Sequence, residues 1–224
     1  MHIAVFGIGG VGGYFGGRLA QVGEEVTFIA RGAHLQALQT QGLRVDSTLG
    51  DFVLHPVQAT NDPRQVGAVD TVLVAVKAWQ VPEVADALRP LVGAATGVIT
   101  LQNGVEAPEQ LAAVFGRSAV VGGLCGPISF RVAPGHIRHV GGEPFVKFGE
   151  LDDRASPRLD QLRQAFQRAG VTVEIPPDIH SALWMKLLAI TPCSGLGALS
   201  YAPKGIWWQL PATRQMSEQA MHLE

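Results

Sequence analysis

Charged residues and cysteines are both scarce in this chain of 224 residues. Only 16% of its residues are charged, and the 17 basic and 19 acidic side chains nearly cancel to a formal net charge of −2. That balance gives no indication of nucleic-acid or anionic-membrane binding. The two cysteines, Cys125 and Cys193, form neither a CxxC motif nor a zinc-ligand spacing. We therefore expect no metal site and a reducing, cytoplasmic location.

Long apolar runs and targeting signals are also missing. The longest apolar runs, such as residues 71–76, are far shorter than the ~20 residues that span a bilayer, so we expect no membrane segment. The start has no basic region and no cleavage site, so we expect no signal peptide. There is no internal repeat and no low-complexity tract. The composition is 47% hydrophobic, which is ample for a folded core in one or two domains.

Glycine, by contrast, is abundant, with 27 residues, and its most informative cluster lies near the start of the chain. A short apolar run is followed by Gly7-Ile8-Gly9-Gly10-Val11-Gly12 and then by a helical stretch. Strand, Gly-x-Gly-x-x-Gly turn and helix together form the dinucleotide-binding fingerprint. Gly7 would allow the tight turn, Gly9 the approach of a pyrophosphate and Gly12 the packing of helix on strand. The helix N-terminus would offer N–H groups to the phosphates. The alternative is a glycine-rich packing turn without a ligand.

Apolar strands and helical stretches alternate through the first two thirds of the chain. Further strands are expected over residues 25–30, 70–76, 97–101 and 119–124, and helices over residues 34–41, 82–88 and 106–115. Continuous apolar runs are typical of parallel strands that are covered on both faces. The pattern predicts an α/β fold with a Rossmann-type, doubly wound parallel sheet.

Antiparallel pieces are expected to accompany this sheet. Residues 43–54 predict a hairpin, and residues 129–140 and 145–148 predict antiparallel strands. An amphipathic helix over residues 156–169 and an edge strand over residues 171–174 complete the expected α/β domain.

From Asp178 onward the chain is predicted to be all-helical. Asp178 is a suitable N-cap for a helix over residues 179–190, and a last helix is expected over residues 206–223. We place the domain boundary at Pro176-Pro177, giving an NADP-binding domain over residues 1–176 and a helical domain over residues 177–224. About 48 residues are few for an independent core. Exposed apolar side chains and association into a dimer or larger assembly are therefore expected, with four candidates near the end of the chain: Trp207, Trp208, Leu210 and Met216.

Three polar side chains directly follow expected strands, namely Arg31, Lys77 and Asn103. The carboxyl ends of parallel strands face the ligand crevice of such a sheet, so these residues are candidates for holding a cofactor and an anionic substrate. An arginine rather than an acidic residue after the second strand favours a 2′-phosphate, and hence NADP. The alternatives are a solvated arginine, a surface lysine and a plain turn at Asn103-Gly104.

Lys186 is the only charged residue in the apolar stretch over residues 182–190. Its ammonium group could extend to solvent from a packed helix face. Alternatively, the lysine lies in a cleft, where partial burial would lower its pKa and make it a proton donor near neutral pH.

Together these features resemble the ketopantoate reductase (2-dehydropantoate 2-reductase) family over residues 1 to about 199. The resemblance rests on the glycine fingerprint, Arg31, Val-Lys-Ala-Trp-Gln from Val76, Gln-Asn-Gly from Gln102, and Asp-Ile-x-x-Ala-Leu-Trp-x-Lys-Leu from Asp178. It implies that Gly7–Gly12, Arg31, Lys77 and Asn103 bind NADPH, with Asn103, Lys186 and Ser194 on the substrate. It further implies that Lys186 protonates the carbonyl oxygen of a 2-oxo acid while NADPH delivers a hydride to C2. With ketopantoate the product is pantoate, on the route to pantothenate and coenzyme A.

The chain departs from the family pattern in its helical part. Ile190 occupies the position of an asparagine one turn after the lysine and cannot hydrogen-bond a substrate. Ser194 replaces a second asparagine, and Pro192 should kink or end the helix. The resemblance also implies a longer helical domain, so we expect residues 177–224 to be an incomplete one. Two alternatives therefore remain open: a reductase of another 2-oxo acid, and an NADPH-binding protein with lost or weakened catalysis.

Overall fold

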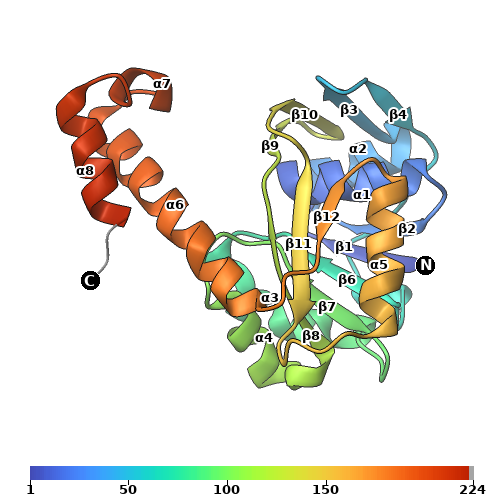
Figure 1. Ribbon diagram of the computed structural model, residues 1–224. Helices are drawn as coiled ribbons and strands as arrows, with labels where there is room; N and C mark the ends of the chain where they lie inside the picture. The colour runs from blue at the N-terminus through green and yellow to red at the C-terminus, as the bar shows by residue number, and fades with distance from the viewer. Residues whose placement is uncertain (222–224) are drawn as a thin grey trace.

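An eight-stranded sheet is the central element of the structure, a computed structural model that describes residues 1–221 (Figure 1). Its strand order is β12-β11-β8-β7-β6-β1-β2-β5. The strands are β1 (His2–Phe6), β2 (Glu25–Ile29), β5 (Gln58–Thr60), β6 (Thr71–Val74), β7 (Gly97–Thr100), β8 (Val120–Cys125), β11 (Phe145–Glu150) and β12 (Thr172–Glu174). All neighbouring pairs are parallel except β8 and β11. The predicted parallel sheet is confirmed, with β5 as an unpredicted edge strand.

Helices cover both faces of this sheet, as the apolar strands predict. One face packs on α1 (Gly10–Gln21) and α5 (Pro157–Arg168), and the other on α3 (Val81–Leu88) and α4 (Ala107–Phe115). In β1, Ile3 and Val5 belong to the first core, while Ala4 and Phe6 belong to the second. Because successive side chains of a strand point to opposite faces, both sets must be apolar here. The doubly wound architecture is therefore confirmed.

A second, four-stranded sheet covers the outer side of α1. Its order is β4-β3-β10-β9, with β3 (Leu43–Ser47), β4 (Phe52–Leu54), β9 (Ile128–Ala133) and β10 (His136–Gly141). The predicted hairpin forms β3 and β4, but the parallel pairing of β3 with β10 was not predicted. A Cβ on Gly12 would lie 2.2 Å from the Gly7 carbonyl oxygen, and one on Gly13 would lie 2.6 Å from Ile137. The glycine-rich helix therefore fits closely between the two sheets.

The chain ends in three helices that extend away from the sheets (Figure 1). They are α6 (Ile179–Ser200), α7 (Lys204–Trp207) and α8 (Pro211–Met221). The first half of α6 packs on β8 and β11 through Ile179 and Leu183, and its far end packs on α7 and α8, where Leu196 and Trp207 are buried. The all-helical character expected after Asp178 is confirmed for the described residues.

Two helix predictions in this region were wrong, and prolines explain both. α6 does not end at Ile190 but continues through Pro192, because a proline removes a single backbone donor and the helix can resume beyond it. The single helix predicted over residues 206–223 is instead two helices, since Pro211 begins α8, a position that proline favours. Residues 222–224 of that prediction lie outside the described part of the chain.

The expectation of no membrane segment rested on the length of uninterrupted apolar runs, and α6 is a longer apolar helix. At 22 residues the helix is long and apolar enough to cross a bilayer by length and composition alone. One such helix is weak evidence for a membrane span, since helices of soluble proteins pass the same test.

The apolar side chains expected to be exposed near the end of the chain divide into two groups. Leu210 and Met216 are exposed, as expected. Trp207 is buried, and Trp208 is half-buried with the Lys204 ammonium 5.3 Å from its ring centroid. The expectation was wrong for Trp207 because α7 folds back onto α6.

Candidate active site

The predicted site residues line up along the carboxyl edge of the main sheet. Strands β2, β1, β6, β7 and β8 are adjacent and parallel. They are followed, in that spatial order, by Arg31, the Gly7–Gly12 loop, Lys77, Asn103 and the Cys125 carbonyl that Lys186 contacts. With about 4.8 Å between neighbouring strands, these ends cover about 19 Å. The edge therefore suits an extended ligand.

The glycine loop has the shape that a pyrophosphate requires. Gly7 has a φ of +99°, and a Cβ there would lie 2.7 Å from the Val76 nitrogen, so only glycine fits this turn. A Cβ on Gly9 would meet nothing within 4 Å, and no side chain caps the N-terminus of α1. The first N–H groups of this helix therefore face open space. Ile8 is buried in the core, so only its backbone is available to a ligand. The loop fits a dinucleotide.

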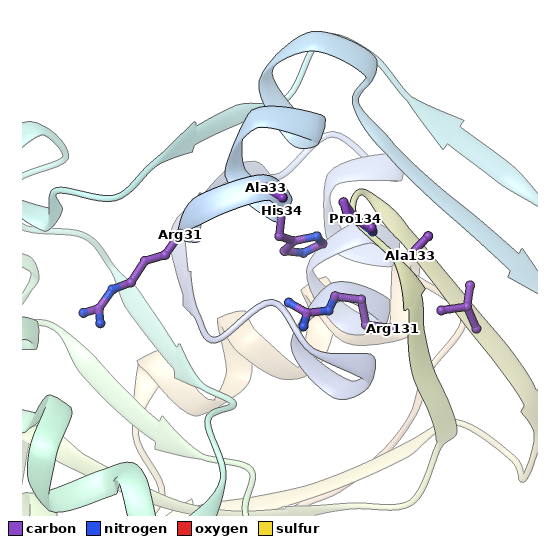
Figure 2. Close-up of a pocket in the computed structure, with 7 residues that line it drawn as sticks. Arg31, Ala33, His34, Arg131, Ala133 and Pro134 are labelled. Atoms are coloured by element: carbon purple, nitrogen blue, oxygen red, sulfur yellow. The ribbon is translucent and has the colours of Figure 1, made fainter.

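Arg31 lies two residues beyond the end of β2 and is the N-cap of α2 (Gly32–Gln41), where it borders a pocket of about 390 Å³ (Figure 2). Ala33 and His34 line the same side, and the opposite wall is formed by residues 131–133 at the end of β9 together with Pro134 of the following turn. None of the lining residues is acidic. Sequence reasoning identified Arg31 but missed Arg131, because the strands over residues 129–140 were predicted but their pairing with β3 and their packing on α1 were not.

Gln102 connects the ends of β6 and β7. Its buried side chain donates hydrogen bonds from Nε2 to the carbonyl oxygens of Val74 at 2.8 Å and Val76 at 3.0 Å. Lys77 follows directly after Val76, and Asn103 follows directly after Gln102. One buried amide thus fixes the relative positions of two exposed candidate ligands. The sequence contained a signal for this role, since a glutamine that follows a buried strand needs hydrogen-bond partners.

Lys186 turns toward the sheet edge rather than away from it. Its Nζ donates a hydrogen bond to the carbonyl oxygen of Cys125, the last residue of β8. Burial lowers the pKa of Lys186 below its ordinary value, and the neighbouring Cys125 acts in the opposite direction. Burial also raises the pKa of the Cys125 thiol to about 11, so the thiol stays neutral at physiological pH. A half-buried ammonium group thus lies at the end of β8, next to the strand that leads to Asn103.

Ser194 is the one predicted site residue that the structure does not bring to this edge. It lies on the exposed part of α6, two turns beyond Lys186. On a regular helix that separation is about 12 Å along the axis and about 80° around it. Ile190, one turn after Lys186, is half-buried and offers only an apolar side chain.

Comparison with known proteins matches this chain to one family. Residues 3–153 match the family model described as ketopantoate reductase PanE/ApbA. The chain is 34% identical over 220 residues to the 2-dehydropantoate 2-reductase of Mesorhizobium japonicum, covering 88% of this chain and 67% of that one. It is 32% identical over 225 residues to the corresponding enzyme of a Nostoc species, covering 98% of this chain and 70% of that one.

Solved structures give the same match. The crystal structure of 2-dehydropantoate 2-reductase from Geobacter metallireducens has a TM-score of 0.94 and 34% identity. The match covers 99% of this chain and 73% of that chain. The chain thus covers between 67% and 73% of the length of these three relatives.

Proposed function

This chain belongs to the PanE/ApbA ketopantoate reductase family, and from that premise we propose that it reduces a 2-oxo acid to the 2-hydroxy acid with NADPH. The first candidate substrate is 2-dehydropantoate (ketopantoate), the compound in the names of its relatives. The product is then pantoate, formed in the cytoplasm on the route to pantothenate and coenzyme A.

One observation carries this proposal: the half-buried ammonium group of Lys186 lies on the same sheet edge as the glycine loop. The loop N–H groups would hold the pyrophosphate, Arg31 the 2′-phosphate, and Lys77 and Asn103 the remainder of the cofactor and the substrate. When bound, NADPH supplies the hydride.

Lys186 has the properties that the chemistry needs. Reduction of a ketone develops negative charge on the carbonyl oxygen, so a nearby ammonium group stabilises the transition state more than the ground state. Partial burial strengthens this electrostatic effect. It also lowers the pKa of the amine, which makes the ammonium a better proton donor near neutral pH.

A second function is favoured by one specific residue. Ile190 is apolar where the family pattern has an amide one turn after the lysine, so contacts to a pantoate-like hydroxyl are missing from this turn. This favours either a different 2-oxo acid or cofactor binding without turnover.

NADPH oxidation measured against a panel of 2-oxo acids tests the proposal. We expect turnover with ketopantoate above that with the other acids. A preference for another acid would establish the different-substrate alternative. NADPH binding by calorimetry together with no oxidation by any acid would establish the binding-protein alternative.

A further inference from the structure

The pocket beside Arg31 has walls from two sheets, and its far wall is held in a defined position. β9 runs along the start of α1, where a Cβ on Gly10 would lie 2.0 Å from the Ser129 carbonyl oxygen. Further along the strand, Arg131 is paired with Ile137, which is fully buried against α1. Residues directly opposite each other on neighbouring strands share a face of the sheet. Arg131 therefore lies on the inner face, toward α1 and the glycine loop.

The charges in this pocket are all of one sign. Arg31 and Arg131 are both exposed, and neither forms an ion pair with any residue in the part of the chain that the structure describes. α2 begins at Gly32 without a side-chain cap, so its positive end adds to the field. Two unpaired guanidinium groups without an acidic neighbour give the pocket a positive potential that attracts an anion.

His34 lines the same pocket and has a buried ring. The ring is 5% exposed, and its Nδ1 accepts a hydrogen bond from the Gly135 N–H at 2.8 Å. The proton of the neutral ring therefore sits on Nε2, which is buried and faces the Ile8 carbonyl without forming a hydrogen bond of regular geometry. Burial lowers the pKa of His34 and the charge of Arg131 lowers it further, while the Ile8 carbonyl acts in the opposite direction. The ring is thus neutral beside Arg131, so the positive charge of the pocket comes from its two arginines.

We propose that Arg131 and Arg31 together bind the 2′-phosphate of the cofactor, so that selection of NADPH is shared between the main sheet and the second sheet. This inference rests on the proposed use of NADPH. A phosphate monoester carries a charge of about −1.5 to −2 at pH 7 and three acceptor oxygens. Guanidinium groups match these acceptors with paired N–H donors. NADH has a neutral hydroxyl at this position and gains nothing from a second arginine.

Calorimetric titration of the full chain with NADPH, NADH and adenosine 2′-monophosphate tests this proposal. The variants are Arg131→Gln, Arg31→Gln and the double substitution. Arg138→Gln is the matched control, since Arg138 lies on β10 opposite Phe130, whose side chain is exposed on the outer face of the second sheet. We expect Arg131→Gln to weaken the binding of NADPH and of adenosine 2′-monophosphate about tenfold. Arg131→Gln should leave the affinity for NADH and the melting temperature unchanged. The control Arg138→Gln should leave the affinities for all three ligands unchanged.

The outcomes separate this inference from the proposed function. If the wild type prefers NADPH and Arg131→Gln keeps the same ratio of NADPH to NADH affinity, the role of Arg131 is refuted and NADPH use stands. An equal loss for both cofactors would also refute it, because it would indicate a structural effect. If the wild type binds both cofactors equally and does not bind adenosine 2′-monophosphate, both the NADPH preference and the shared site are refuted.

Discussion

At the scale of single residues, Lys186 is the side chain on which catalysis should depend most. Lys186→Ala removes the group that stabilises charge on the carbonyl oxygen, so we expect kcat to fall by at least ~10²-fold. The affinity for NADPH should hardly change, because the loop and Arg31 lie at the other end of the sheet edge. Measuring kcat, NADPH affinity and melting temperature on the same variant checks this. Lys204→Ala, a change on α7 remote from the edge, is the control. Loss of stability with unchanged kcat per folded molecule would contradict the catalytic role.

The lowered pKa of Lys186 also predicts how activity depends on pH. Burial favours the neutral amine, with Cys125 as a partial offset, so the folded-state pKa lies below that of a free lysine. A proton donor must be protonated, and kcat should therefore fall as pH rises through this lowered pKa. The Cys125 thiol, at about 11, titrates too high to explain such a decline. A kcat profile of the wild type should show this alkaline limb. The residual activity of Lys186→Ala should lack it, and a limb that persists there must be assigned to another group.

Gln102 should influence the cofactor without touching it. Gln102→Met keeps the size of the side chain but leaves the Val74 and Val76 carbonyls without their donor, which should cost ~1–3 kcal/mol of stability. It should also weaken NADPH binding, because Lys77 and Asn103 are no longer held together. Thr100→Val is the matched control, since it removes another buried hydrogen bond of β7, to the Gly123 N–H at 3.1 Å. The control should lower the melting temperature but leave NADPH affinity unchanged. If both variants bind NADPH as the wild type does, Gln102 is only a structural residue.

Sequence reasoning succeeded and failed at this scale for physical reasons. Arg31, Lys77 and Asn103 each follow a strand, so local pattern alone places them at the carboxyl edge. Arg131 lies in β9, whose sheet joins β3 to β10, segments far apart in the chain. No local pattern encodes that pairing. The second wall of the pocket was therefore visible only in the structure.

At the scale of whole elements, most helices and strands were predictable and their packing partners were not. The central parallel strands are predominantly apolar and almost fully buried, which is the signature of burial on both faces. The second sheet has ordinary alternation, so it could be predicted as hairpins but not as a cover for α1. Helix ends were least predictable where prolines lie, as at Pro192 and Pro211.

Glu24, directly before β2, forms ion pairs with Met1, directly before β1, and with Arg168 of α5. These ion pairs make the stability of the protein depend on pH. The carboxylate accepts hydrogen bonds from the amino group of Met1, at 2.6 Å, and from Arg168 of α5. Burial raises the pKa of Glu24, but these two cations outweigh it and leave the pKa below its ordinary value. A carboxyl group with a lowered folded-state pKa stabilises the fold above its unfolded-state pKa, and this stability is lost as pH falls through the folded-state pKa.

Glu24→Gln should therefore destabilise the protein near neutral pH by ~1–3 kcal/mol, since it removes charge-assisted hydrogen bonds from a buried position. Denaturant unfolding of both proteins between neutral and acidic pH measures the difference. The gap should narrow as pH falls, because protonation removes the same charge from the wild type. A gap that is constant with pH would mean that the ion pairs contribute no net stability.

At the scale of the whole molecule, the helices α6 to α8 form an arm that extends away from the sheets (Figure 1), and few of its side chains are buried. On this arm Leu199 is 78% exposed and Leu210 is 54% exposed. Apolar surface of this kind drives association, and we predict that the chain forms a dimer or larger assembly at tens of micromolar. Light scattering over a dilution series measures this directly.

Substitutions can show whether the arm is the surface responsible. The double variant Leu199→Lys with Leu210→Lys should shift the assembly toward monomer, because charges on both partners would have to be desolvated at the interface. Val53→Lys is the control, since Val53 is 62% exposed on β4, in the second sheet and away from the arm. Val53→Lys should leave the molar mass of the assembly in light scattering unchanged. A wild-type monomer at these concentrations would contradict the prediction, and dissociation caused by Val53→Lys alone would move the interface to the second sheet.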